Sequence, residues 1–335
     1  MTDFFELLLA GNNLSAVDMQ KIMRACMKGE LSEVQIGVFL ALMRVKGETT
    51  EELKAAATVM LELAHCIDLG DDLIDIVGTG GDGKNTFNVS TASSIVAAAA
   101  GAKVAKHGNR SVSSRSGSSD LLTQAGIELH LSDKQLKESM QKNNLCFLFA
   151  PHFHQAMQHA RAARQQLGIR SLFNLLGPLI NPARVKKQVV GVFDKRWQEP
   201  LLQVLIHLGS ERSMIVTSRD GMDEVSIADK TDVLEYQNHA IKSWEINPAD
   251  YGCYHASLDD VIVTSPVESL AIINKVFAGE KGAARDLVLL NTSLALYCAN
   301  IADSVKDGME RAAAAIDNGA AKHCFEQLAQ INRGR

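Results

Sequence analysis

The chain has 335 residues, of which 46% are hydrophobic and 22% are charged, and this composition excludes an intrinsically disordered protein. The formal net charge of −5 disfavours nucleic acid as the main partner, because proteins that neutralise phosphate backbones usually carry a basic excess. At about 150 residues per domain, the length predicts roughly two domains.

The six cysteines form no CxxC pair and several lie in apolar runs, which predicts reduced, buried thiols. The first residues lack the early basic side chains of a signal peptide. No apolar run reaches the ~18 residues that are needed to cross a bilayer. We therefore expect a cytoplasmic protein that does not bind membranes.

Residues 1–66 have the pattern of a small helical unit. Ser15, Ser32 and Thr49 each stand before an apolar-periodic run and are followed three residues later by an acid or amide. In this capping-box pattern, the side chains satisfy free backbone amides of the first helical turn. The pattern predicts helices over 19–27, 34–45 and 53–64.

Beyond residue 66 the pattern changes to short strands that alternate with helices. Residues 73–77 form a β-branched run that ends in glycines, and residues 90–100 form an alanine-rich helical stretch. Such alternation predicts an α/β domain. Further strands are predicted at 103–105, 146–150, 189–193, 214–217 and 233–236, a helix at 154–166 and a turn at 174–182.

The glycine-rich segment 78–83, GTGGDG, follows the first predicted strand and suits close approach of backbone amides to an anion. It matches GxGxxG, but no helix begins at once and no acid follows the next strand, as a dinucleotide site requires. It also fails as a P-loop, because Asn85 stands where Ser or Thr would bind magnesium. We therefore favour an anion site of another geometry over both motifs and over a purely structural turn.

Two further segments fit a phosphate site. Ser90 and Thr91 stand where a helix should begin, so their hydroxyls can cap the helix or contact a phosphate. Residues 106–120 place lysine and arginine among glycines and serines, which is typical of a mobile lid over phosphate oxygens. The adjacent acids Asp223 and Glu224 follow a predicted strand and are suited to magnesium, which prefers oxygen ligands.

Several long motifs together resemble the anthranilate phosphoribosyltransferase family. They are DIVGTGGDG from Asp75, FNVSTAS from Phe87, KHGNRSVSS from Lys106, GSSD from Gly117, RQQLGIRSLFNLLGPLINPA from Arg164 and GMDE from Gly221. The resemblance covers essentially the whole chain. It implies a magnesium-dependent transferase that joins the phosphoribosyl group of phosphoribosyl pyrophosphate (PRPP) to the amine of anthranilate, releasing pyrophosphate, in tryptophan biosynthesis.

The resemblance also implies roles for individual residues. Lys106, Asn109 and Arg164 are implied to take part in catalysis, and Ser90, Asp223 and Glu224 to bind the metal. The residues implied to face anthranilate are Gly78, His107, Asn109 and Arg164. Those implied to bind PRPP are Gly78, Gly81, Asp82, Thr86, Asn88, Val89, Ser90, Thr91, Lys106 and Ser118.

The implied fold has a small helical domain, residues 1–66, completed by helices within 155–185. The larger α/β domain, 70–154 and 186–335, has a central mixed sheet like that of nucleoside phosphorylases, and the helical domains form a homodimer. Gln155 and Ala163 depart from the family pattern near the acceptor entrance. Two alternatives stay open: a fold-related nucleoside phosphorylase, and a non-enzymatic relative that binds nucleic acid.

Overall fold

The computed structural model describes residues 2–110 and 117–331. The N-terminal helices are α1 (Thr2–Leu9), α2 (Ala16–Met27), α3 (Glu33–Lys46) and α4 (Thr50–Glu62). Ser32 and Thr49 form complete capping boxes, with Gln35 and Glu52 as the reciprocal partners. Ser15 caps α2 by accepting a hydrogen bond from the backbone N–H of Asp18. The predicted helices are thus confirmed.

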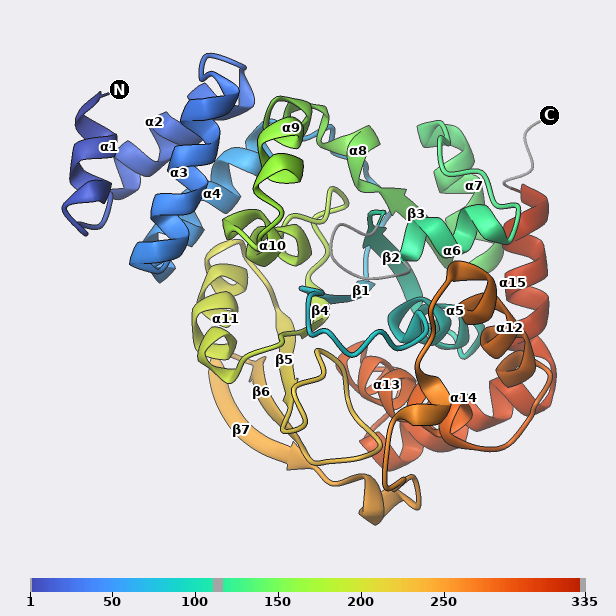
Figure 1. Cartoon of the computed structure of the whole chain (residues 1–335). Coiled ribbons are helices and arrows are strands. Elements are labelled where there is room, and N and C mark those ends of the chain that lie inside the picture. The colour runs from blue at the N-terminus through green and yellow to red at the C-terminus, as the bar shows by residue number, and fades with distance from the viewer. Residues whose placement is uncertain (1, 111–116, 332–335) are drawn as a thin grey trace.

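Two later helices, α9 (Gln158–Leu167) and α10 (Leu172–Leu176), pack against the N-terminal helices. α9 contacts α2 and α3, whereas α10 contacts α3 and α4. Figure 1 shows these green helices beside the blue ones at one end of the molecule. The predicted helix at 154–166 begins later than expected, after a 3-10 turn, η1 (Gln155–Met157). The predicted turn at 174–182 contains the end of α10 and η2 (Gly177–Leu179).

The centre of the molecule is a mixed sheet, which has seven strands in the described part of the chain. The order is β3-β2-β1-β4-β5-β6-β7. The first five strands in this order pair in parallel with their neighbours, whereas β5 with β6 and β6 with β7 pair antiparallel. The strands are β1 (Leu73–Gly78), β2 (Lys103–Gly108), β3 (Leu145–Phe149), β4 (Lys187–Gly191), β5 (Arg212–Ser218), β6 (Thr231–Gln237) and β7 (Ala240–Ile246). A small helical part and an α/β part with a mixed sheet confirm the predicted fold class.

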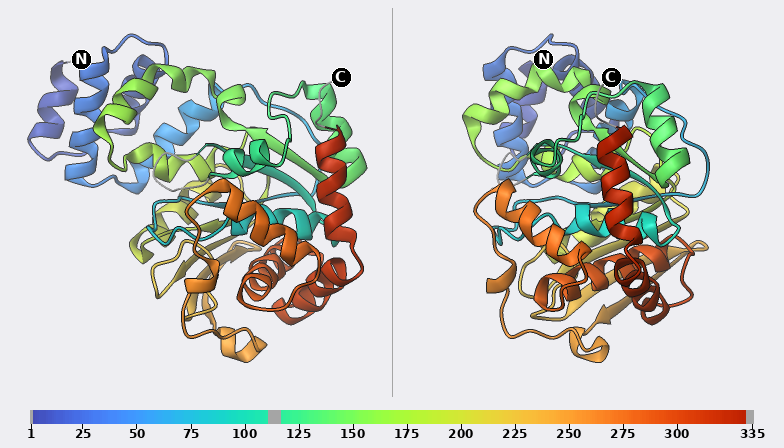
Figure 2. Two further views of the ribbon diagram at one scale, coloured as in Figure 1. Left: turned by 45° about the vertical axis from the view of Figure 1, so that its right-hand side comes forward. Right: turned by 90° about the vertical axis from the view of Figure 1, so that its right-hand side faces the viewer.

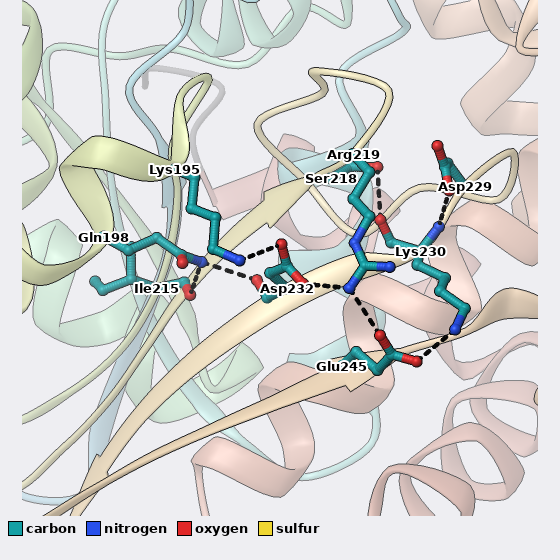
Figure 3. Close-up of polar contacts among 9 residues, drawn as sticks. All are labelled: Lys195, Gln198, Ile215, Ser218, Arg219, Asp229, Lys230, Asp232 and Glu245. Atoms are coloured by element: carbon teal, nitrogen blue, oxygen red, sulfur yellow. Dashed lines mark hydrogen bonds and ion pairs between the residues drawn. The ribbon is translucent and has the colours of Figure 1, made fainter.

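The edge strand β7 was not predicted. Its side chains are mostly exposed, so it lacks the apolar run that identified the other strands. Antiparallel pairing with β6 holds it in place. A surface ion-pair network adds to this pairing (Figure 3). Arg219 pairs with both Asp232 and Glu245. Asp232 also pairs with Lys195, and Glu245 also pairs with Lys230. Charges at an edge discourage pairing with another sheet.

Helices cover both faces of the sheet. The main hydrophobic cluster joins one face to α5 (Val89–Ala99), α12 (Pro266–Phe277), α13 (Ala283–Cys298), α14 (Val305–Asp317) and α15 (Ala320–Ile331). Figure 2 shows the orange and red helices grouped together, with the red C-terminal helix α15 rising alongside the sheet. α11 (Gln198–His207) shares a second cluster with the N-terminal helices, whereas α7 (Asp133–Asn143) packs on β3. The remaining short elements are α6 (Ser118–Gln124), α8 (Ala150–Phe153), η3 (Lys195–Trp197), η4 (Pro248–Tyr251) and η5 (Asp259–Val261).

Among the helices of the described residues, none combines the length and apolar character that a membrane span requires.

Candidate active site

A cavity of about 940 Å³ lies where β1, β2 and β3 end. The carboxyl ends of parallel strands meet at one edge of a sheet, where α/β proteins commonly bind ligands. On the opposite side the cavity is lined by α9 and by the turn that contains η2. The predicted site residues that line it are Gly78, Gly81, Asp82, Thr86, Asn88, Val89, Ser90, Lys106, His107, Asn109, Ser118, Arg164, Asp223 and Glu224.

The glycine-rich loop forms the cavity wall beyond β1. Gly80, Gly81 and Gly83 have φ values of 66°, 76° and 75°, which glycine adopts without strain. A Cβ atom at Gly78 would collide with Oδ2 of Asp223. The backbone N–H of Gly80 donates a 2.7 Å hydrogen bond to the same carboxylate oxygen. The loop therefore lies directly on one member of the acid pair, 143 residues away in the chain.

The N-terminus of α5 forms the next part of the wall. Its N-cap residue Asn88 makes no side-chain cap, and its amide oxygen instead accepts from the Ser269 hydroxyl at 2.8 Å. The backbone N–H of Ser90 donates to Oε1 of Glu224 at 2.9 Å. Thr91 is the predicted site residue that does not line the cavity; it is buried behind the wall, and its hydroxyl has no hydrogen-bond partner among the described residues. Its predicted phosphate contact stays a prediction.

Lys106 and His107 reach the cavity from β2, and both are almost fully buried. The Nζ atom of Lys106 donates to the Ile76 carbonyl at 2.6 Å and to the Ser90 hydroxyl at 3.3 Å. Burial lowers the pKa of Lys106, while Asp75 and Glu224 oppose that shift. Burial also lowers the pKa of His107, so the imidazole is neutral, and its Nε2 has no partner in residues 2–110 and 117–331.

Three carboxylates, those of Asp82, Asp223 and Glu224, line the cavity beside the glycine-rich loop. Burial, followed by the charge of Asp82, raises the pKa of Asp223 to about 7. Burial and the charges of Asp223 and Asp82 raise the pKa of Glu224 well above its ordinary value. A divalent cation would offset this repulsion, so the residues fit magnesium.

The described residues contain no group of three His, Cys, Asp or Glu side chains arranged to hold a metal by themselves. This fits magnesium, which commonly takes one or two carboxylates and completes its shell with water and substrate phosphates.

The rest of the cavity wall is built from the end of β2, the residues that follow it, and α9. The Ser118 hydroxyl donates to the Asn109 carbonyl at 3.3 Å, which brings the two ends of the serine-rich segment together. The lid predicted within 106–120 falls partly on residues 111–116, which lie outside the described residues. The Arg164 guanidinium lies 5.3 Å from the centre of the Phe173 ring.

Sequence reasoning missed several residues of the cavity wall. His130, His154 and Met157 line the cavity, but they lie outside the motifs that the sequence presents. Asp75 stands inside an apolar strand, where a carboxylate is unfavourable unless the fold compensates it, so its position is itself a signal in the sequence.

Two family models match the chain: "Glycosyl transferase family, helical bundle domain" over residues 2–64 and "Glycosyl transferase family, a/b domain" over residues 70–322. An anthranilate phosphoribosyltransferase of Legionella pneumophila (strain Corby) is 62% identical, with 97% of this chain and 94% of the relative covered. One from Hydrogenovibrio crunogenus is 45% identical, with 98% of both chains covered.

Solved structures of the same family superpose on this one. The anthranilate phosphoribosyltransferase of Thermus thermophilus matches with a TM-score of 0.91 at 36% identity, covering 98% of this chain and 99% of that one. The Saccharomyces cerevisiae enzyme in complex with PRPP and Mg matches with a TM-score of 0.89 at 29% identity, covering 98% and 97%. With relatives this similar over nearly its whole length, the chain belongs to the anthranilate phosphoribosyltransferase family.

Proposed function

We propose that this protein transfers the phosphoribosyl group of PRPP to the amine of anthranilate, forming N-(5-phosphoribosyl)anthranilate and pyrophosphate in tryptophan biosynthesis. The observation that carries this proposal is one cavity that joins an anion-binding wall, three carboxylates and an arginine-bearing helix. The relatives with high identity bear the name of this activity.

The donor half binds the phosphates of PRPP. The glycine-rich loop and the N-terminus of α5 line the cavity, and the positive end of the helix dipole attracts anions there. Lys106 has three N–H donors and uses two on Ile76 and Ser90, which leaves one for a phosphate oxygen. Gly78, Gly81, Asp82, Thr86, Asn88, Val89, Ser90 and Ser118 surround the same space. The contact of Thr91 with a phosphate stays a prediction.

Asp223 and Glu224, with the Ser90 hydroxyl, hold magnesium. When bound, the ion supplies positive charge beside the pyrophosphate. The carboxylates lie at the boundary between the glycine-rich loop and α5, because Asp223 accepts from Gly80 and Glu224 accepts from Ser90. The acid pair is thereby fixed against the two segments that bind the phosphates.

The acceptor half binds anthranilate, with Arg164 at its carboxylate and Gly78, His107 and Asn109 close to its amine. An arginine recognises a carboxylate through two parallel hydrogen bonds. The amine attacks C1 of the ribose as the C1–O bond breaks, and pyrophosphate leaves with the electron pair. The ammonium proton then passes to solvent. His107 is not needed as a base, because the neutral aromatic amine is already a nucleophile.

Rate acceleration therefore comes mainly from placement and from preorganised charge. Holding the amine against C1 removes much of the entropic barrier. Lys106 and the positive end of the α5 dipole stabilise the negative charge that develops on pyrophosphate.

The division of the chain and its assembly are also part of the proposal. α9 and α10 complete the helical domain formed by residues 1–66, because they pack on its helices. An exposed apolar stripe on α3 supports a homodimer formed through this domain. The free cysteines and the biosynthetic family support a cytoplasmic enzyme.

The direct test is to mix the protein with PRPP, magnesium and anthranilate. We expect anthranilate fluorescence to fall while pyrophosphate appears in equal amount, and both changes to stop when magnesium is chelated. Constant fluorescence with no pyrophosphate would overturn the proposal. Release of pyrophosphate without loss of anthranilate would indicate donor hydrolysis only.

A further inference from the structure

Asp75 is a buried carboxylate that does not line the cavity and has no part in the mechanism above. It lies in the middle of β1 with 0% of its surface exposed. Within residues 2–110 and 117–331, no lysine or arginine forms an ion pair with it. A charge in such a place is unfavourable unless hydrogen bonds compensate it, so its contacts should indicate its purpose.

The two oxygens of Asp75 accept hydrogen bonds from two different segments. Oδ1 accepts from the backbone N–H of His107 at 3.2 Å, and Oδ2 accepts from the Asn181 side chain at 2.8 Å. His107 follows Lys106 on β2 and precedes Asn109 by two residues. The carboxylate thus holds the end of the strand that carries three predicted site residues.

Asn181 is buried and its polar atoms are fully used. Its Nδ2 also donates to the Ala105 carbonyl at 2.8 Å, and its Oδ1 accepts from the backbone N–H of Ala183 at 2.9 Å. Asn181 lies near the end of the turn formed by residues 177–182. From this turn Gly177, Pro178 and Ile180 line the cavity, which Arg164 also lines. Asp75 and Asn181 therefore link the strand end that serves the donor half to the turn that serves the acceptor half.

We propose that the buried Asp75–Asn181 pair positions the β2 end against the 177–182 turn, and so aligns donor with acceptor. The proposal rests on the proposed transferase function. A carboxylate is required because both partners are N–H donors, whereas an asparagine at position 75 would present an amide N–H to one of them. The pair acts through His107, Lys106 and the turn, and is not itself in contact with substrate.

The test compares Asp75→Asn, Asn181→Asp and the double variant that exchanges the two residues. Loss of alignment predicts that Asp75→Asn lowers kcat about 10- to 100-fold, since small misplacements of reacting groups are that costly. The KM for PRPP should change less than kcat, because the glycine-rich loop and α5 keep their contacts even where Lys106 moves. In the double variant an amide at position 75 can again donate to a carboxylate at position 181, but that carboxylate would also face the Ala105 carbonyl, so kcat should stay well below that of the parent.

Glu235→Gln is the matched control. Glu235 is a buried carboxylate on β6 that pairs with Arg212 at 2.8 Å, and it does not line the cavity. This variant should lower the melting temperature and leave kcat per folded molecule unchanged. A kcat for Asp75→Asn equal to that of the parent, or an equal loss in Glu235→Gln, would overturn the positioning role. Absence of turnover in the parent would instead contradict the proposed function.

Discussion

At the scale of single residues, Asp223 and Glu224 are held close to Asp82. In the described part of the chain none of the three forms an ion pair with a lysine or arginine. Their mutual repulsion is tolerable if a divalent cation joins the site. We expect Asp223→Ala to lower kcat/KM by about 10²–10³-fold, the usual loss when one electrostatic element of an active site is removed.

The measurement is the initial rate over a range of magnesium concentrations. Asp229→Ala is a suitable control, because Asp229 is an exposed acid in the same connection between β5 and β6. It should behave like the parent. Parent-like rates for Asp223→Ala at every magnesium concentration would remove Asp223 from the metal site.

Arg164 allows a test confined to the acceptor. Its guanidinium packs near the Phe173 ring and lines the cavity, and no carboxylate of the described residues forms an ion pair with it. Loss of a charged hydrogen bond of about 1.5–3 kcal/mol predicts that Arg164→Ala raises the KM for anthranilate roughly 10- to 100-fold. The KM for PRPP should stay within about twofold. Steady-state kinetics with each substrate varied in turn would measure both constants. The KM of Arg164→Lys for anthranilate should lie between those of the parent and Arg164→Ala. An unchanged KM for anthranilate in Arg164→Ala would refute the role.

The donor half of the site was predictable from the sequence, whereas most of the acceptor half was not. Gly78, Asp82 and Ser90 lie within 13 consecutive residues and line the cavity through local backbone geometry. His130 lies in the loop before α7, and His154 follows the short helix α8 after β3. Their isolated positions in the sequence carry no periodic or motif signal.

At the scale of elements, strands and helices were predicted correctly where their buried residues leave a recognisable pattern in the sequence. The strands β1 to β6 were found because each contains at least a short stretch of buried apolar residues. β7 was missed because hydrogen bonds to β6 and surface ion pairs hold it, and neither leaves an apolar run in the sequence. Helix starts were well predicted where a side chain caps them, as at Ser32 and Thr49.

The start of α4 depends on one buried acid. Glu52 is fully buried, pairs with Lys46 at 2.8 Å, and accepts from the backbone N–H groups of Leu14 and Thr49, each at 2.8 Å. It therefore ties α3, α4 and the α1–α2 connection together. Removing one partner of a buried pair typically costs about 3–5 kcal/mol.

We therefore expect Glu52→Gln to reduce the free energy of unfolding by roughly 3 kcal/mol, measured by chemical denaturation. The control is Glu51→Gln, next in the sequence, whose exposed pair with Lys54 should contribute little. Equal stability of the two variants would show that the Glu52 network does not hold the helices together.

At the scale of the whole molecule, the helical part contributes α9 to the cavity and presents a different surface outward. Val34, Val38 and Val45 lie on one side of α3, four and seven residues apart, and are 76%, 41% and 86% exposed. The opposite side of α3 is buried in the domain core. An exposed apolar stripe of this kind marks a protein interface, and here it supports the proposed homodimer.

A charge in the centre of this stripe should break the dimer, because an unpaired carboxylate would be removed from water at the interface. We expect the parent to sediment at about twice the chain mass of 36.3 kDa and Val38→Glu to sediment as a single chain. Val267→Glu is the matched control, since Val267 is 58% exposed on α12 in the α/β domain, and this variant should remain dimeric. A dimeric Val38→Glu would place the interface elsewhere, and a monomeric parent would remove the dimer from the proposal.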